Sequence, residues 1–363
     1  MQDIPVRLRI MNEILIIGGG IAGVSAAAAL APHARVTLLE AESAIGTQTS
    51  GRSAAMFLAN FGNPVVQALN RASYEDLKEV LTPRGMLLLG RAEDATAFQA
   101  ECSGFGMAEI SVAEAMEHLP ILNPAHVAFA ARREDVFDLD TDRLLQSYAR
   151  TVRTHGAKIV RNAKVSAVSR SGKGWEVVAG GAAYKADILI NAAGAWADGV
   201  AKLAGVVPIG IQPYRRSMAR LPAPGGLDVR AWPFVISVGE RWYAKPDAGS
   251  WLVSPADAEP MDPHDAWADD MVLAEGLARY EEMVTEPVVR LQSSWAGLRS
   301  FAPDQTLVVG PDKGEPSFFW LAGQGGYGFQ SAPAASRLVA DLVLGRAPAL
   351  EAEVVAALGP ARF

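Results

Sequence analysis

The sequence predicts an α/β fold with a parallel sheet, into which a smaller α+β part is inserted. An apolar run over 14–17 breaks into glycines and continues as an Ala-rich segment over 21–30. A second apolar, β-branched run over 35–39 ends at Glu40, so strand, turn, helix, strand and acid fit within about 30 residues. A further buried strand of this kind returns only at 188–191. The long interval predicts that part of the intervening chain is inserted.

Composition excludes several function classes. The 363 residues carry 33 Lys and Arg against 40 Asp and Glu, a net charge of −7, and half are hydrophobic. A large core is therefore expected, while an acidic chain is a poor binder of nucleic-acid phosphates. The single cysteine, Cys102, excludes an intrachain disulfide and a Cys-based metal site, and the five histidines are not clustered. We expect no metal and no nucleic-acid partner.

The chain ends give expectations about location. No apolar run reaches the roughly 18 residues of a transmembrane helix, and the first ten residues lack a secretory pattern. We expect a cytoplasmic protein, either free or peripheral at the inner face of the membrane. Residues 1–10 are expected to be a disordered extension, and translation could start at Met1 or at Met11.

The remaining elements follow from apolar periodicity and breakers. Asp140 or Thr141 is expected to cap a helix, because the acidic run 138–142 lacks the glycine and distal glutamate of a calcium loop. Antiparallel strands are expected within 209–253. Helices are expected over 65–80, 114–119, 143–154, 262–282 and 332–344, and strands over 87–89, 158–168, 174–178, 308–310 and 318–321.

The glycine turn matches G-x-G-x-x-G. Gly18 permits the tight turn, Gly20 lets the backbone approach a pyrophosphate, and Gly23 allows close helix–strand packing. Ile21 and Ala22 begin the helix, whose free N–H groups favour phosphate oxygens. Glu40, about 20 residues further on, is placed to accept hydrogen bonds from ribose hydroxyls.

The continuation of the chain favours a flavin over a nicotinamide dinucleotide. After Glu40 the sequence enters a small-residue loop containing 50–55, rather than further parallel strand–helix units. Nucleotide-facing segments return discontinuously, at 188–194 and in the glycine cluster 323–328. A nicotinamide dehydrogenase is the alternative.

Five segments carry a more specific resemblance: 18–23, 50–55, 191–196, 295–301 (WAGLRSF) and 324–330 (QGGYGFQ). They resemble the FAD-dependent D-amino-acid oxidase family, from Met11 to about Gly345. Within that family the chain is most similar to the bacterial D-arginine dehydrogenases. The resemblance implies a Rossmann-like FAD-binding domain formed by 11–80, 141–208 and 300–350, and a substrate domain, built on an antiparallel sheet, formed by 81–140 and 209–299.

The resemblance also implies noncovalently bound FAD, and it assigns residues to the cofactor. The small-residue loop would line the flavin, Val165 would face the adenine, and the C-terminal glycine segment would aim N–H groups at the flavin, where reduction gathers negative charge. The cofactor residues are Gly18, Gly20, Ile21, Ala22, Gly23, Glu40, Ser50, Gly51, Arg52, Ser53, Ala54, Ala55, Val165, Gly194, Trp196, Arg299, Gln324, Gly325, Gly326, Tyr327, Gly328 and Gln330.

Substrate contacts follow from the charge of an amino acid. Arginine binds a carboxylate through two parallel hydrogen bonds, and Arg299 and Arg216 lie in segments that match the family. Tyr243 would donate a further hydrogen bond to the carboxylate. The carbonyl of Gly326 would accept one from the substrate amine.

The chain departs from the D-arginine dehydrogenases around the substrate side chain. Met56 and Phe61 stand where they have histidine and tyrosine, and the stretch that ends at Met86 lacks their glutamate. A buried guanidinium without a partner would be costly. An apolar pocket walled by Met56, Phe61 and Met86 is therefore expected, unless a carboxylate from elsewhere in the chain replaces the missing one.

The implied reaction is FAD-dependent oxidative deamination of D-amino acids, with a preference for neutral, hydrophobic side chains. The alternatives are oxidation of glycine, sarcosine or proline-type amines on the same fold, and a flavoprotein without catalysis. Neither the electron acceptor, oxygen or a quinone, nor the oligomeric state follows from the sequence.

Overall fold

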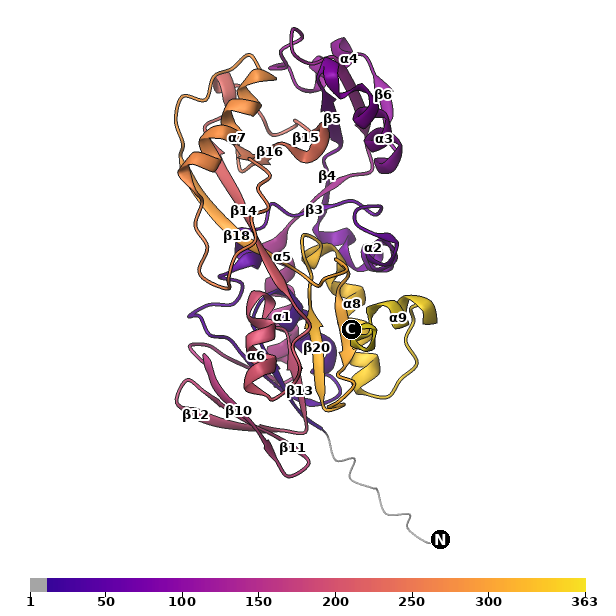
Figure 1. Ribbon diagram of the computed structural model, residues 1–363, viewed down its shortest axis with the longest axis vertical. Helices are drawn as coiled ribbons and strands as arrows, with labels where there is room; N and C mark the ends of the chain where they lie inside the picture. Colours follow the sequence, from indigo (N-terminus) through magenta and orange to yellow (C-terminus); the bar gives the residue numbers. More distant parts are fainter. Residues whose placement is uncertain (1–11) are drawn as a thin grey trace.

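The computed structural model describes residues 12–363, so the expectations for residues 1–10 and for the translation start lie outside the described residues. Its lower half in Figure 1 is built on a six-stranded sheet in the order β19-β20-β13-β1-β2-β9. Every pair is parallel except β19–β20. The strands are β1 (Glu13–Ile17), β2 (Arg35–Leu39), β9 (Lys158–Val160), β13 (Ile188–Asn191), β19 (Val308–Pro311) and β20 (Phe318–Ala322).

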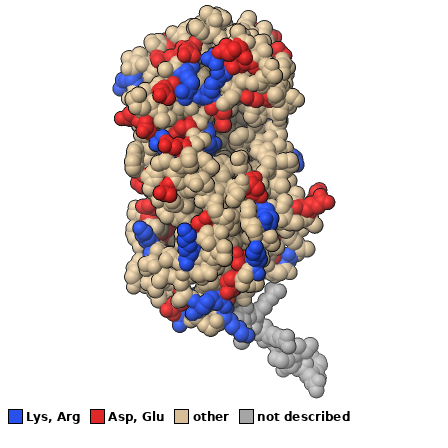
Figure 2. Space-filling model, in the orientation of Figure 1, with Lys and Arg blue, Asp and Glu red and all other residues tan. Residues whose placement is uncertain are grey.

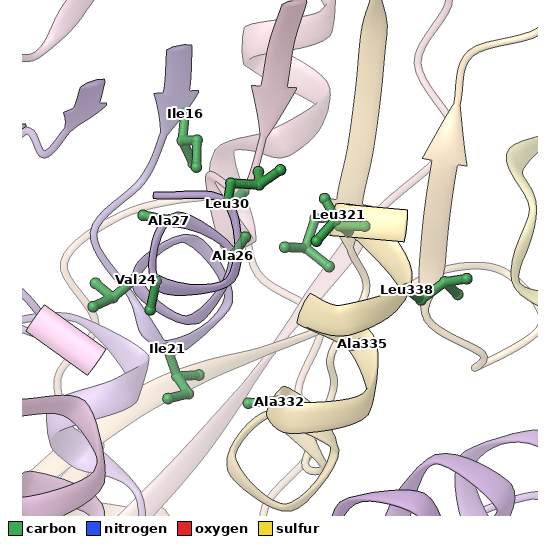
Figure 3. Close-up of a cluster of buried hydrophobic side chains, with 14 of the residues drawn as sticks. Ile16, Ile21, Val24, Ala26, Ala27, Leu30, Leu321, Ala332, Ala335 and Leu338 are labelled. Atoms are coloured by element: carbon green, nitrogen blue, oxygen red, sulfur yellow. The ribbon is translucent and has the colours of Figure 1, made fainter. Parts of the chain in front are cut away.

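Alternating side chains of this sheet enter two cores. Ile14 and Ile16 of β1 face a helical layer, in which α1 packs against α8 and α5. Figure 3 shows the contact between α1 and α8, where Ala26 and Ala335 permit close approach. Leu15 contributes to the opposite core, beneath α6 and a three-stranded sheet. These helices are α1 (Ile21–Leu30), α2 (Pro64–Leu77), α5 (Thr141–Thr154), α6 (Ala197–Leu203), α8 (Gly328–Val343) and α9 (Ala352–Leu358).

The upper half of Figure 1 is built on an eight-stranded sheet in the order β18-β14-β17-β16-β15-β5-β7-β6. The expectation of a purely antiparallel sheet was wrong at one pair, since β5 and β15, which lie far apart in the chain, run parallel. The strands are β5 (Met86–Gly90), β6 (Ala108–Ile110), β7 (Phe129–Arg133), β14 (Gln212–Leu221), β15 (Phe234–Ser237), β16 (Tyr243–Asp247), β17 (Ser250–Ser254) and β18 (Ser293–Phe301).

Helices cover both faces of this second sheet. Leu87 and Val235 belong to a core with α4 (Val112–His118) and α7 (Asp270–Glu282). Leu88 and Ile236 belong to a core with α3 (Ala95–Phe105) on the other face. Two three-stranded sheets complete the fold: β10 (Val165–Ser171), β11 (Gly174–Ala179) and β12 (Ala182–Ala186); and β3 (Met56–Phe57), β8 (Phe137–Leu139) and β4 (Leu81–Pro83). The proposed division into two domains stays a prediction.

Several elements differ from expectation. The segment 262–269 is irregular, because Asp269 caps α7 by accepting hydrogen bonds from the N–H groups of Met271 and Val272. The expected strand over 158–168 is interrupted between β9 and β10, and α8 begins at Gly328 rather than at 332. The Asp140 cap is confirmed, since its side chain accepts from the Arg143 N–H at 2.9 Å.

Candidate active site and cofactor cavity

A cavity of about 790 Å³ extends from the carboxyl ends of β1 and β2 to the eight-stranded sheet. Chain segments from both halves of the molecule contribute to its wall. Nearly all of the sequence-predicted residues line it: Gly18, Gly20, Ile21, Ala22, Glu40, Ser50, Arg52, Ser53, Ala54, Ala55, Met56, Phe61, Met86, Val165, Gly194, Trp196, Arg216, Tyr243, Arg299, Gln324, Gly325, Gly326, Gly328 and Gln330.

The glycine turn forms one end of the cavity. Gly18 has φ +112°, and a Cβ placed there would lie 2.3 Å from the carbonyl oxygen of Ala192. Helix α1 starts at the cavity without a side-chain cap on Gly20, and the Ile21 N–H donates to Ser50 Oγ at 2.9 Å. The turn therefore presents free backbone N–H groups and a positive helix end to an anion.

Glu40 is buried beside this turn. Its two carboxylate oxygens accept from the backbone N–H groups of Gly19, at 2.6 Å, and Glu42, at 2.7 Å. Burial raises the pKa of Glu40, while both hydrogen bonds oppose the shift. Each oxygen keeps a lone pair directed at the cavity wall, which suits a carboxylate that binds hydroxyl groups.

Three predicted cofactor residues do not line the cavity. Gly23 lets α1 approach the glycine turn, because a Cβ there would lie 1.9 Å from the Gly18 carbonyl oxygen. Gly51 likewise packs on Gly46. Tyr327 precedes α8, and its ring contacts those of Phe61 and Phe301 at centroid distances of 5.3 and 6.1 Å. These residues shape the wall from behind.

Arg52 touches the cavity, but its guanidinium is engaged by protein groups. It donates to the carbonyl oxygens of Ala266 and Ala296 and pairs with Asp265 at 2.5 Å. Arg52 thus fixes the irregular segment 262–269 against β18. A direct contact of this guanidinium with FAD is not supported by its geometry.

Arg299 stands at the junction of β18 and the C-terminal glycine segment. Gly325 has φ +51°, its N–H donates to the Ser300 carbonyl at 2.8 Å, and a Cβ there would lie 2.2 Å from the Phe301 ring. Gly326 follows directly, with a Cβ position 3.7 Å from Arg299 Nη1. Only glycine at position 325 permits this close approach.

Arg299 lacks an acidic partner within residues 12–363, and its buried Nε has no hydrogen-bond acceptor. Burial, and then the charge of Arg216, lower the pKa of Arg299. A buried guanidinium remains a cation at neutral pH. It is therefore a cation whose burial is uncompensated, and binding of an anion would relieve that cost.

Arg216 is buried and already paired. Its Nε donates to the Asp257 carbonyl at 2.9 Å, and its Nη1 lies 3.3 Å from Glu240 Oε1. Its guanidinium also lies 5.5 Å from the centroid of the Tyr243 ring, whose hydroxyl points at the Met218 sulfur at 3.3 Å. Arg216, Tyr243 and Arg299 are thus brought to one end of the cavity.

Glu240 on this wall corrects the expectation of a pocket without an acid. It follows Gly239 in a tight turn, with φ +49° at Glu240 itself, and Glu101 of α3 accepts the Gly239 N–H at 2.8 Å. Sequence reasoning missed Glu240 because no motif contains it. Its place three residues before Tyr243 was the only available signal.

Apolar side chains form the rest of this end. Met56, Phe61 and Met86 line it as expected, together with Leu58, Phe105, Val136, Phe234 and Ile236, which were not anticipated. The described lining contains no cysteine or histidine, and Cys102 is buried within α3. No group of three or more His, Cys, Asp or Glu residues within 12–363 is arranged to bind a metal ion.

Surface properties add two observations. On the face drawn in Figure 2, acidic and basic side chains are interspersed, without an extended basic area. No helix between residues 12 and 363 combines the length and apolar character needed to cross a bilayer.

The glycine turn, the buried carboxylate and the discontinuous wall together define a protein that encloses a dinucleotide. Residues 13–342 match the FAD dependent oxidoreductase family, DAO, and the chain belongs to this family. FAD is therefore its cofactor, and the uncapped helix end and free guanidinium described above suit that anionic molecule.

Relatives and solved structures agree with this assignment. FAD-dependent oxidoreductase domain-containing protein 1 of Mus musculus is 25% identical over 92% of this chain and 81% of that protein. The Bos taurus form is 30% identical, over 43% of this chain and only 35% of its own length. L-proline dehydrogenase from P. horikoshii has a TM-score of 0.81 at 24% identity, covering 97% of this chain and 98% of that one. Glycine oxidase from Geobacillus kaustophilus has a TM-score of 0.82 at 22% identity, covering 97% and 100%.

Proposed function

We propose that this FAD-dependent oxidoreductase oxidatively deaminates D-amino acids with neutral, apolar side chains. The observation that carries the proposal is the unpartnered Arg299 guanidinium beside Gly326, at the end of the cavity lined by apolar side chains. A carboxylate would bind to this guanidinium through paired charge-assisted hydrogen bonds. The resemblance to D-arginine dehydrogenases supports the D configuration.

The charges at this end favour a neutral side chain. Arg216 and Arg299 contribute two positive charges and Glu240 one negative charge, which leaves a net charge of +1. An amino acid with a neutral amine and one carboxylate carries −1 and balances this excess. A basic side chain would carry an unmatched positive charge into the cavity, which is costly in a low-dielectric site. We therefore place D-arginine and D-lysine below D-leucine, D-methionine and D-phenylalanine.

The protein's own groups would orient the substrate. Arg299 and Tyr243 would hold the carboxylate, and the Gly326 carbonyl would accept a hydrogen bond from the amine. When FAD is bound, its isoalloxazine accepts the hydride that leaves Cα. The amine must be neutral, because its lone pair forms the new C=N bond. The described lining holds no histidine to take the proton, so we assign that proton to water. Hydrolysis of the imino acid gives the 2-oxo acid and ammonia.

The proposal is tested by product analysis. Holoenzyme is mixed with D-leucine or D-phenylalanine and an artificial electron acceptor, and 2-oxo acid, ammonia and reduced acceptor are quantified. We expect all three in equal amounts. Reduction by glycine, N-methylglycine or proline, with none by D-amino acids, would instead identify a secondary-amine or glycine oxidase. No reduction by any of these compounds would support a noncatalytic flavoprotein.

A further inference from the structure

Beyond the anchor, the cavity continues across one face of the eight-stranded sheet. Tyr243 pairs with Ile236 on the neighbouring strand, and Phe234, two residues before Ile236 and so on the same face, pairs with Met86. All four side chains line the cavity. Met86 pairs in turn with Arg133 of β7. The sheet face is therefore a floor that leads from the anchor strand β16, across β15 and β5, to β7.

The end of α3 closes this floor. Phe105, the last residue of α3, lines the cavity, and the helix stops there because Gly106 adopts φ +62°. Three strand spacings separate β16 from β7, a span of about 14 Å. That span exceeds what the side chain of an aliphatic amino acid fills.

Polar contacts outside the cavity hold Phe105 in place. The Arg133 guanidinium donates to the Phe105 carbonyl oxygen and, at 2.7 Å, to Asn60 Oδ1. Asn60 Nδ2 in turn donates to the Gly104 carbonyl at 3.3 Å. A cation at a helix C-terminus is also favoured by the helix dipole. These contacts tie α3 to the loop that carries Phe61.

We infer that Phe105 is the residue that limits side-chain length in this enzyme, and that Arg133 positions it. The compartment between Tyr243 and Phe105 would accept extended apolar or aromatic side chains until they meet the Phe105 ring. Shortening Phe105 would lengthen the compartment toward α3 without altering the anchor. This inference rests on the proposed carboxylate anchor at Arg299.

The test uses binding, so that it does not depend on turnover. The probes are benzoate, phenylacetate, 3-phenylpropionate, 4-phenylbutyrate and 5-phenylpentanoate, titrated into holoenzyme while the flavin absorbance is followed. In the wild type, affinity should rise by about fourfold per added methylene and then fall where the chain meets Phe105. Phe105→Ala should move the optimum to a longer acid, and Phe105→Leu should move it less.

Two further variants separate the wall from general packing. Phe129→Leu alters a ring that stacks on Phe98 in the same core, at 5.3 Å, but that does not line the cavity. It should leave the optimum unchanged. Arg133→Gln should improve binding of the longest acid alone, since the anchor is untouched.

An unchanged optimum in both Phe105 variants would refute the inference, as would an equal shift in Phe129→Leu. Absence of binding by every acid would refute both the inference and the anchor. If the optimum shifts as expected but no D-amino acid reduces the flavin, the length limit stands and the proposed function fails.

Discussion

Replacing Arg299 by methionine separates substrate anchoring from stability. The wild-type guanidinium has no acidic partner within residues 12–363, and its Nε has no acceptor. Removing it therefore strands no buried carboxylate, and methionine retains the apolar contact with Phe301. Loss of paired charge-assisted hydrogen bonds to a carboxylate should cost about 2–5 kcal/mol. At about 1.4 kcal/mol per factor of ten, kcat/KM should fall by roughly 30- to 4,000-fold.

The assay is anaerobic stopped-flow reduction of the flavin by D-leucine, alongside thermal unfolding of the same protein. We expect unfolding of Arg299→Met to occur at or above the wild-type temperature, because an uncompensated buried charge is gone. Arg216→Met is the matched control. It leaves Glu240 and the Asp257 carbonyl without their donor, and should lose about 1–3 kcal/mol of stability. Wild-type reduction kinetics in Arg299→Met would refute the anchor.

Three further predictions follow from the same wall. Glu240→Gln raises the charge at the substrate end from +1 to +2, so the kcat/KM ratio of D-glutamate to D-leucine should rise about tenfold; an unchanged ratio contradicts the charge balance. Gly325→Ala forces a Cβ to within 2.2 Å of the Phe301 ring at φ +51°, so Arg299 and Gly326 should be displaced and phenylacetate binding to the holoenzyme lost, whereas the solvent-facing Gly181→Ala should bind normally. Burial raises the pKa of Glu40, so as pH rises the unfolded chain releases this proton before the native apoprotein does, and the free energy of unfolding contributed by Glu40 declines from the ordinary value of 4.5 through the raised one; denaturant titrations should lose this component in Glu40→Gln, and an identical pH profile would contradict the assignment.

The nucleotide end could be predicted because its chemistry is local in sequence. The tight turn at Gly18, the helix from Ile21 and the acid at Glu40 occupy one βαβ unit, whose spacing alone indicates the element types. The helix 262–282 was wrong over its first eight residues, because Asp269 competes as a cap and Arg52, far away in sequence, binds the Ala266 carbonyl.

The substrate end depends on contacts between distant segments. Glu240 reaches the cavity through a left-handed turn that Glu101 of α3 supports, and Phe105 reaches it from a helix that the sequence pattern did not reveal. The parallel pairing of β5 with β15 likewise joins segments about 150 residues apart. Propensity and periodicity carry no information on such pairings.

The most direct test of the central claim, that Arg299 anchors a D-amino acid against the bound flavin, compares enantiomers in a single turnover. Anaerobic holoenzyme is mixed separately with D- and L-leucine, and bleaching of the oxidised flavin is followed. The account predicts rapid bleaching by the D enantiomer alone, slowed when its Cα carries deuterium. Bleaching by L-leucine at the same rate, or none by either enantiomer, would contradict it.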